Sequence, residues 1–323
     1  MRRRGYEPKP RRRPSQPTQA NHRNRSACHI HPAAMKPAAR RPLLLCALAA
    51  AAALSFLLVA PPPPLAAHLS SLLLAFPASP YAGRPKLLFL LAGQSNMAGR
   101  GLAPHPLPAP FRPHPRVLRL AASRRWVVAA PPLHADIDTH KVCGLGPAMP
   151  FAHRLLEDAG SGESSLVLGF VPAAVGGTRI WMWAKGELLY EAAVARARAA
   201  LAAGGGTLAA VLWFQGESDT IELDDATAYG GRMERLVNDF RADLGIPDLL
   251  VIQVGLASGE GNYTDIVREG QKNIKLPNVI LVDAIGLPLQ DDQLHLSTEA
   301  QLWLGDMLGQ AYLKFNSSTD SRQ

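Results

Sequence analysis

The sequence predicts an α/β fold: about five parallel strands between two layers of helices, a three-layer α/β/α arrangement of flavodoxin-like size. Two observations lead to this prediction. From residue 87 onward, short and nearly continuous apolar runs alternate with longer segments of helical periodicity, as in parallel sheets whose strands are buried on both faces. Polar or glycine-rich clusters follow several of these runs, at the strand ends where ligands bind in such sheets.

The apolar runs predict the strands, and the periodic segments between them predict the helices. The expected strands are Leu87–Ala92, Ser165–Val171, Leu208–Phe214, Leu249–Val254 and Val279–Val282. The expected helices are Pro147–Ala159, Glu187–Ala203, Asp224–Leu244, Thr264–Ile274 and Thr298–Phe315. The proline-rich residues 101–146 show no sustained period, so we expect a long loop there, either a wall of a substrate cleft or a surface insertion.

The positive charge of the chain is concentrated at its N-terminal end. Residues 1–42 contain 12 of the 34 Lys and Arg residues and one acidic residue, Glu7, and the rest of the chain is mildly acidic. This composition predicts a disordered basic tail. We expect no nucleic-acid binding by the folded part, because its charge is not basic.

An uncharged apolar segment of 18 residues, 43–60, follows two arginines and precedes four prolines. It has the length of a short membrane-spanning helix. With the preceding tail retained, it is a signal anchor that places the following domain in the lumen or outside the cell. If translation begins at Met35, it is the apolar core of a cleaved signal peptide and the protein is secreted. A plastid transit peptide is a third interpretation.

The rest of the chain divides by composition. Residues 61–86 form a Pro- and Ala-rich linker, 87–315 the folded domain and 316–323 a short tail. The folded domain contains a single cysteine, Cys143, so no disulfide can form within it.

A serine follows the first predicted strand, in the turn Gly93-Gln94-Ser95-Asn96. A serine in this position is a candidate nucleophile when a base can accept its proton. His295 can be that base, because imidazole titrates near neutral pH. Asp292, three residues earlier, can orient the imidazole and fix its tautomer.

Acyl transfer also needs hydrogen-bond donors for the developing oxyanion. The backbone N–H of Ser95 is one candidate. A backbone N–H of Gly176 or Gly177, in the glycine turn after the second strand, is another. The side-chain amide of Gln215, after the third strand, is a further candidate.

Four ordered blocks, GQSNMAGRG, VPAAVGGTRI, WFQGESD and DDQLHLS, resemble the successive blocks of SGNH-type (GDSL-like) hydrolases. They are most similar to carbohydrate esterase family six, the plant group with the sialate O-acetylesterase domain, and the similarity extends from Leu87 to Leu313. The resemblance implies that Ser95 is the nucleophile, His295 the base and Asp292 its partner. It also implies an oxyanion hole at Ser95, Gly176–Gly177 and Gln215.

The same resemblance implies deacetylation of a carbohydrate, such as acetylated xylan, without a metal or organic cofactor. An acetylated carbohydrate is then the expected partner, and a membrane is a partner only if residues 43–60 are retained. A lipase or thioesterase of the same fold and a noncatalytic carbohydrate-binding protein remain as alternatives. Acyl-chain preference separates the first from an acetylesterase, and labelling by fluorophosphonates separates the second.

Other polar residues near these blocks have competing interpretations. Glu217 and Asp219 can be a glycosidase acid–base pair, but we expect them to support the loop that carries Gln215. Asn96, Arg179 and Trp181 are candidates for substrate contact or loop support, and Trp183 for contact or core packing. The segment 134–140 contains two histidines and two aspartates, but no second cluster completes a metal site.

Overall fold

The computed structural model describes residues 79–160, 166–202 and 206–320. The predicted basic tail, the apolar segment 43–60 and most of the linker lie outside these residues. Among the helices that the structure describes, none is long and apolar enough to cross a membrane.

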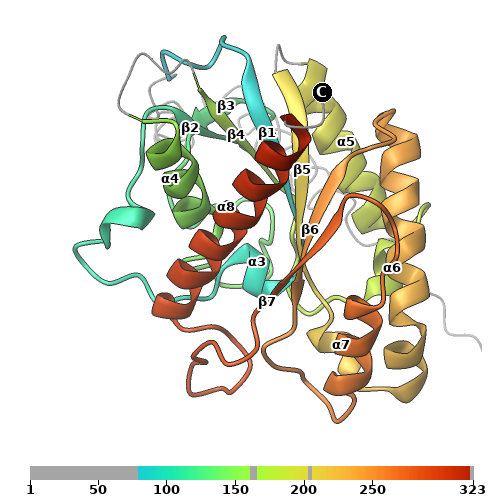
Figure 1. Cartoon of the computed structure of the whole chain (residues 1–323). Coiled ribbons are helices and arrows are strands. Elements are labelled where there is room, and N and C mark those ends of the chain that lie inside the picture. Colours follow the sequence, from blue (N-terminus) through green and yellow to red (C-terminus); the bar gives the residue numbers. More distant parts are fainter. Residues whose placement is uncertain (1–78, 161–165, 203–205, 321–323) are drawn as a thin grey trace, which may run out of the picture. The chain divides into compact units, whose positions relative to one another are not determined.

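A mostly parallel sheet of seven strands forms the centre of the fold, in the order β3-β2-β4-β1-β5-β6-β7 (Figure 1). The five predicted strands are present and pair in parallel. They are β1 Lys86–Gly93, β4 Leu168–Pro172, β5 Gly206–Phe214, β6 Leu250–Gly255 and β7 Val279–Asp283. The predicted α/β fold is therefore confirmed.

The remaining two strands lie in residues 101–146, where we expected a loop without regular structure. β2, Val117–Leu120, pairs in parallel with β4, and β3, Trp126–Val128, pairs antiparallel with β2. A short 3₁₀ helix, η1 Ala109–Phe111, precedes them. The expectation of a plain loop was wrong here, because strands of four and three residues are too short to show a period in the sequence.

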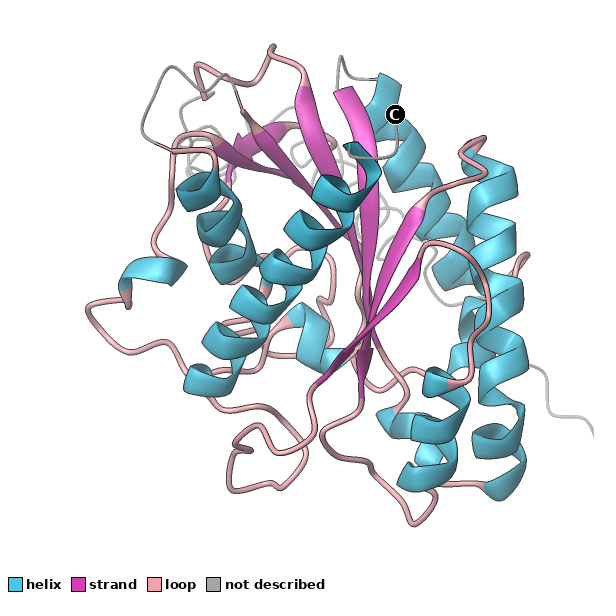
Figure 2. Ribbon diagram, in the orientation of Figure 1, coloured by secondary structure: helices cyan, strands magenta, loops and turns pink. Residues whose placement is uncertain are grey.

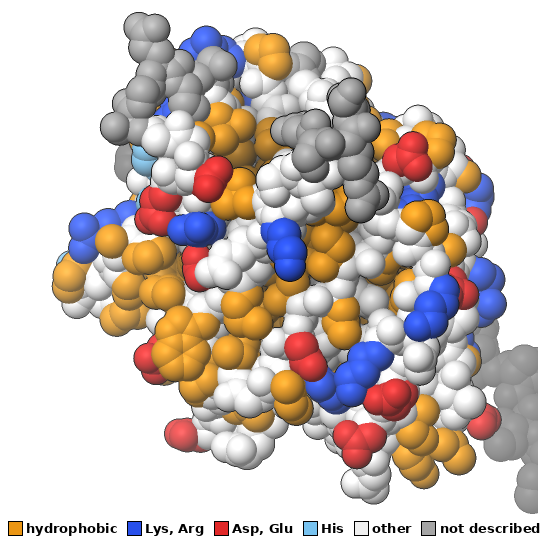
Figure 3. All heavy atoms as spheres, in the orientation of Figure 1, with side chains coloured by type: hydrophobic (Ala, Val, Ile, Leu, Met, Phe, Trp, Pro, Cys, Tyr) orange, Lys and Arg blue, Asp and Glu red, His pale blue; other side chains and the backbone are white. Residues whose placement is uncertain are grey.

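Helices cover both faces of the sheet (Figure 2). α4 Ala148–Asp158 and α8 Thr298–Asp320 pack on one face. α5 Leu188–Ala202, α6 Leu223–Leu244 and α7 Thr264–Lys272 lie on the other. Gly305 permits the close contact of α8 with α4, because a Cβ there would collide with the backbone of Pro147 and Phe151. Acidic and basic side chains are interspersed with apolar ones on the face that Figure 3 shows.

The parallel strands bring four polar segments to the same edge of the sheet. The short helix α3, Ser95–Ala98, follows β1. The glycine turn at 176–177 follows β4, and the 3₁₀ helix η3, Glu217–Thr220, follows β5. The loop that carries His295 comes between β7 and α8.

Candidate active site

The serine turn depends on a glycine at the end of β1. Gly93 has φ +121°, and a Cβ at this position would collide with the backbone of Phe214 in β5. The Gln94 N–H then donates to the Phe214 carbonyl at 2.8 Å, which fixes the chain where α3 begins. Ser95 is therefore held at the first position of α3, with 5% of its surface exposed.

The structure brings Ser95, His295 and Asp292 together. His295 Nε2 lies 3.0 Å from Ser95 Oγ, and His295 Nδ1 lies 2.6 Å from Asp292 Oδ2. The other oxygen of Asp292 accepts the N–H groups of Leu294 and His295, each at 2.9 Å. This arrangement has the order of contacts that a nucleophile, its base and the orienting carboxylate require.

Asp292 is suited to remain ionised beside the imidazole. Burial alone would raise its pKa, but the hydrogen bonds from the His295 N–H, the imidazole and the Leu294 N–H together lower the pKa below its ordinary value. A carboxylate accepts but does not donate hydrogen bonds. The Nδ1 atom of His295 therefore carries the proton, and Nε2 is left to accept the proton of Ser95.

Asn96 connects the serine turn to the histidine loop. Its side-chain Oδ1 accepts the N–H of Leu296 at 2.9 Å, and its Nδ2 lies 3.4 Å from the carbonyl oxygen of Leu294. These two residues flank His295. Nδ2 also donates to Glu217 Oε1 at 2.7 Å. The residue directly after the serine therefore holds both sides of the histidine in register with it.

Glu217 and Asp219 are buried behind the site. Desolvation by burial raises the pKa of Glu217 to about 7 and that of Asp219 to about 6. Asp219 accepts the N–H of Ile180 at 3.0 Å and the amide of Gln215 at 2.5 Å. Both carboxyl groups support neighbouring segments, and neither lines the cleft at Ser95. This placement favours the expected supporting role over a glycosidase acid–base pair.

The glycine turn lies directly against Ser95. A Cβ on Gly176 would lie 3.4 Å from the Cβ of Ser95 and would collide with the guanidinium group of Arg100. The Gly176 N–H already donates to Asp138 Oδ2 at 3.1 Å. In the described part of the chain, the N–H groups of Ser95 and Gly177 have no such acceptor. Both residues also line the cleft, so their amides are candidate donors to a substrate.

Gln215 is completely buried. Its Nε2 donates to the carbonyl oxygen of Thr178 at 2.7 Å and to Asp219 at 2.5 Å, and it lies 3.3 Å from Gln94 Oε1. Both amide hydrogens are therefore engaged within the protein. The role of Gln215 as an oxyanion donor stays a prediction that these hydrogen bonds do not favour.

A cleft of about 240 Å³ opens at Ser95 and His295. Gly176 and Gly177 form part of its lining. Four other residues of the lining were not predicted from the sequence: Arg100, Lys141, Glu260 and Leu294. Arg100 is fixed by Asp138 at 2.7 Å, and it lies in the same block as Ser95. Lys141 and Glu260 come from loops without a recognisable motif.

The residues after the glycine turn divide into three environments. Trp183 is fully buried, donates from Nε1 to Thr178 Oγ1 at 3.1 Å and packs edge-on against Trp213. Arg179 pairs with Asp225 at 2.8 Å. Trp181 is 44% exposed. The side chains of Arg179, Trp181 and Trp183 do not line the Ser95 cleft. Trp183 belongs to the core.

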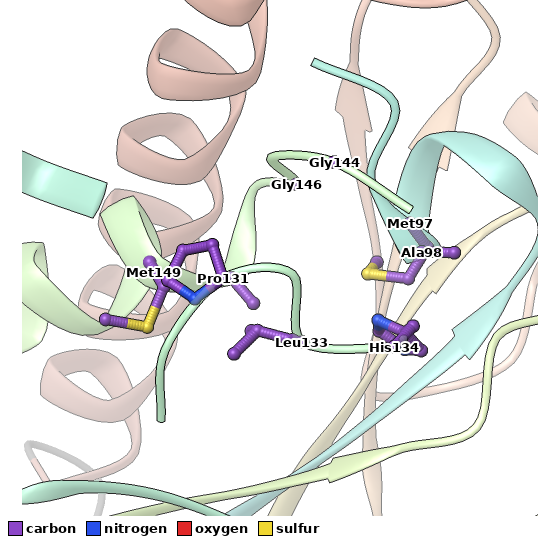
Figure 4. Close-up of a pocket in the computed structure, with 9 residues that line it drawn as sticks. Met97, Ala98, Pro131, Leu133, His134, Gly144, Gly146 and Met149 are labelled. Atoms are coloured by element: carbon purple, nitrogen blue, oxygen red, sulfur yellow. The ribbon is translucent and has the colours of Figure 1, made fainter. Parts of the chain in front are cut away.

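The histidine-rich segment 134–140 does not form a metal centre within the described residues. His134 borders a cavity of about 10 Å³ with Met97, Ala98 and Met149 (Figure 4), which has room for about one water molecule. Burial lowers the pKa of His134 to about 4. His140 is exposed, and Asp138 faces Arg100 and Gly176 instead.

Comparisons with known proteins identify relatives that extend over the whole folded domain. The family model described as "carbohydrate esterase, sialic acid-specific acetylesterase" matches residues 85–314. The probable carbohydrate esterase At4g34215 of Arabidopsis thaliana is 49% identical over 240 residues, which cover 71% of this chain and 91% of that protein.

Solved structures agree with this relationship. The crystal structure of that Arabidopsis protein has a TM-score of 0.68 at 48% identity, covering 71% of this chain and 98% of that one. NanS shares the fold, with a TM-score of 0.58 at 20% identity over 72% of this chain and 98% of its own. The resemblance of the four sequence blocks is confirmed: the chain belongs to the carbohydrate esterase, sialic acid-specific acetylesterase family, a family of carboxylic ester hydrolases.

Proposed function

We propose that this protein removes acetyl groups from a carbohydrate through an acetyl-Ser95 intermediate. The observation that carries the proposal is the continuous chain of contacts from Ser95 Oγ to His295 and on to Asp292, at 3.0 and 2.6 Å. Ser95 and His295, at one end of this series of contacts, line a cleft of about 240 Å³. A cleft of this size, lined by several polar and charged side chains, suits an acetyl group better than the long acyl chain of a lipase substrate.

In the first half of the reaction, Ser95 Oγ attacks the ester carbonyl carbon while its proton passes to His295 Nε2. The carbonyl oxygen becomes an oxyanion, which we expect the N–H groups of Ser95 and Gly177 to stabilise. The tetrahedral intermediate then collapses, and the bond to the sugar oxygen breaks. That oxygen takes the proton from His295 and leaves as a sugar hydroxyl, so the acetyl group remains on Ser95.

In the second half, water takes the place of the sugar. His295 accepts one proton of the water as its oxygen attacks the acetyl carbonyl carbon. The same amides stabilise the second oxyanion. Ser95 Oγ is expelled and regains its proton from His295, and acetate is released. Asp292 keeps the imidazole in the tautomer that both halves require.

Acetate release by the full-length chain tests this proposal. Acetylated xylan, acetylated pectin and a small aryl acetate are the substrates, and the Ser95→Ala variant is the control. We expect acetate from at least one substrate and none above background from the variant, with thermal unfolding nearly unchanged. Equal release by the folded variant would exclude Ser95 as the nucleophile. Faster hydrolysis of long-chain than of acetyl esters would instead favour the lipase alternative.

We also propose that residues 43–60 direct the protein into the secretory pathway. The exposed Asn262 of the sequon Asn262-Tyr263-Thr264 supports a direct test, because N-glycosylation takes place only within that pathway. Expression in plant cells should give a chain that loses mass on endoglycosidase treatment, and Asn262→Gln should reduce this loss. An unglycosylated chain in the cytosolic fraction would contradict the proposal.

A further inference from the structure

A second hollow, of about 280 Å³, lies between the 3₁₀ helix η2, Ile180–Trp183, and helix α6. We name it the Trp181 groove. Its lining includes the exposed indole of Trp181 and the charged side chains of Lys185, Arg232, Arg235 and Asp239. It shares no lining residue with the cleft at Ser95. The groove is therefore a separate feature of the surface.

The side chains of the groove suit a sugar ring. An exposed indole offers a flat apolar face for the C–H groups of a pyranose, and charged groups at its edge can bind hydroxyls. Lys185 and Arg232 are held by ion pairs to Asp243 and Asp225. Within the described residues, the side chains of Arg235 and Asp239 form no ion pair or hydrogen bond. One donor group and one acceptor group are therefore available there.

The groove is connected to the Ser95 cleft through the chain itself. Gly177 lines the cleft and Trp181 lines the groove, and four residues of chain can span no more than about 14 Å. Arg179 lies between them in the sequence and pairs with Asp225 of α6 at 2.8 Å. Arg232, which lines the groove, pairs with the same carboxyl group at 2.7 Å. The indole therefore lies within the reach of a saccharide of a few rings bound at Ser95.

We propose that the Trp181 groove binds a sugar unit of the substrate at a distance from the scissile ester. The substrate is then an acetylated oligo- or polysaccharide and not a free acetylated monosaccharide. This inference rests on the proposed acetylesterase function. Binding of a remote sugar raises kcat/KM on a polymer but not on a small ester, because a small ester has no such sugar unit.

The test compares polymeric with small substrates for two tryptophan variants of the full-length chain. Acetylated xylan, mannan and pectin are the polymers, and an aryl acetate is the small ester. Trp181→Ala should lower the ratio of kcat/KM on the hydrolysed polymer to kcat/KM on the aryl acetate by about three- to tenfold, the range of a single aromatic contact. Trp181→Phe, which keeps a ring face, should retain most of this ratio.

Trp303→Ala is the matched control, because Trp303 is 43% exposed but lies on α8 and outside the groove. It should leave the ratio unchanged. An unchanged ratio for Trp181→Ala, or an equal fall for both variants, would overturn the inference. Hydrolysis of the aryl acetate without hydrolysis of any polymer would overturn it as well, while leaving an esterase. A folded chain inactive on every substrate would instead contradict the proposed function.

Discussion

Two segments of this molecule combine a histidine with a nearby aspartate, and only one of them has the contacts of an acid–base site. In the segment 292–295, both ring nitrogens of His295 are bonded, one to Ser95 and one to Asp292. In the segment 134–138, neither ring nitrogen of His134 has a hydrogen-bond partner of normal geometry. The His295 side chain is 20% exposed, whereas His134 is 1% exposed.

The difference follows from backbone geometry and burial. Gln293 has φ +54°, and the tight turn it makes places one oxygen of Asp292 on two backbone amides and the other on the imidazole. Asp138 is directed to Arg100 and Gly176. A short distance in the sequence between Asp and His therefore does not define an acid–base pair. An acid–base pair is defined instead by the turn between the two residues and by the access of the histidine to a cleft.

The largest expected effect separates the two histidines. His295→Ala should lower kcat/KM on an aryl acetate by about 10⁴-fold or more, because Ser95 then has no base. His134→Leu should retain activity within about threefold, since a neutral buried ring is replaced by an apolar side chain. Initial rates on both purified variants, with circular dichroism to check folding, make the measurement. Equal losses in two folded variants would refute the contrast.

The second-largest effect should separate Asp292 from Asp138, because the first acts on the rate and the second on stability. Asp292→Asn should reduce kcat by up to about 10⁴-fold, because an amide no longer fixes the imidazole tautomer. Asp138→Asn should have a smaller effect on kcat but should destabilise the protein by about 2 kcal/mol or more. This change removes the carboxylate that pairs with the nearly buried Arg100. Steady-state kinetics and chemical denaturation of both variants distinguish the outcomes, and the reverse pattern would exchange the two roles.

Asn96 should have an intermediate effect, through the position of His295. Asn96→Ala removes the contacts to Leu294 and Leu296, so we expect kcat to fall by about 10- to 100-fold. KM should stay within about twofold, because Asn96 does not line the cleft. Asn238→Ala, at an exposed position on α6, is the control. A rise in KM at constant kcat would argue against a positioning role.

The smallest effect concerns stability and not rate. Burial raises the pKa of Glu217 from 4.5 to about 7, so between these pH values the folded chain keeps a proton that the unfolded chain has lost. The free energy of unfolding then falls as the pH rises, by roughly 3 kcal/mol from this group. Glu217→Gln cannot ionise and should remove this fall.

Asp219 contributes a similar fall only up to its own pKa of about 6. Most of that fall is complete by pH 6, and the Gln variant retains Asp219, so comparison of the two proteins by chemical denaturation at pH 6 and pH 7 isolates Glu217. The wild-type protein should lose more stability over this interval than the Gln variant. Parallel curves for the two proteins would mean that Glu217 is already ionised at pH 6 in the fold.

Much of the fold and the site could be predicted because both follow the strand ends of a parallel sheet. The apolar runs 87–92 and 208–214 are buried except for the half-buried Leu87 and Ala209, so their sequences show the strands directly. The clusters at Ser95 and His295 follow β1 and β7. The resemblance to a known family added the roles of individual residues to this placement.

The remainder depends on contacts that no local pattern contains. β2 and β3 are too short to show a period. Two partners of Asn96 are backbone atoms of Leu294 and Leu296, about 200 residues away, and any residue type other than proline offers such atoms. The buried setting of Gln215 depends on Thr178 and Asp219. Lys141 and Glu260 reach the cleft from loops whose course the sequence does not specify.

Covalent labelling of the full-length chain by a fluorophosphonate tests the central claim most directly, because the reagent traps an activated serine. Intact-mass analysis and peptide mapping should show one equivalent bound at Ser95. Ser95→Ala should show none, and His295→Ala should react far more slowly. A wild-type chain that hydrolyses an aryl acetate without being labelled, or a label on another serine, would contradict the account.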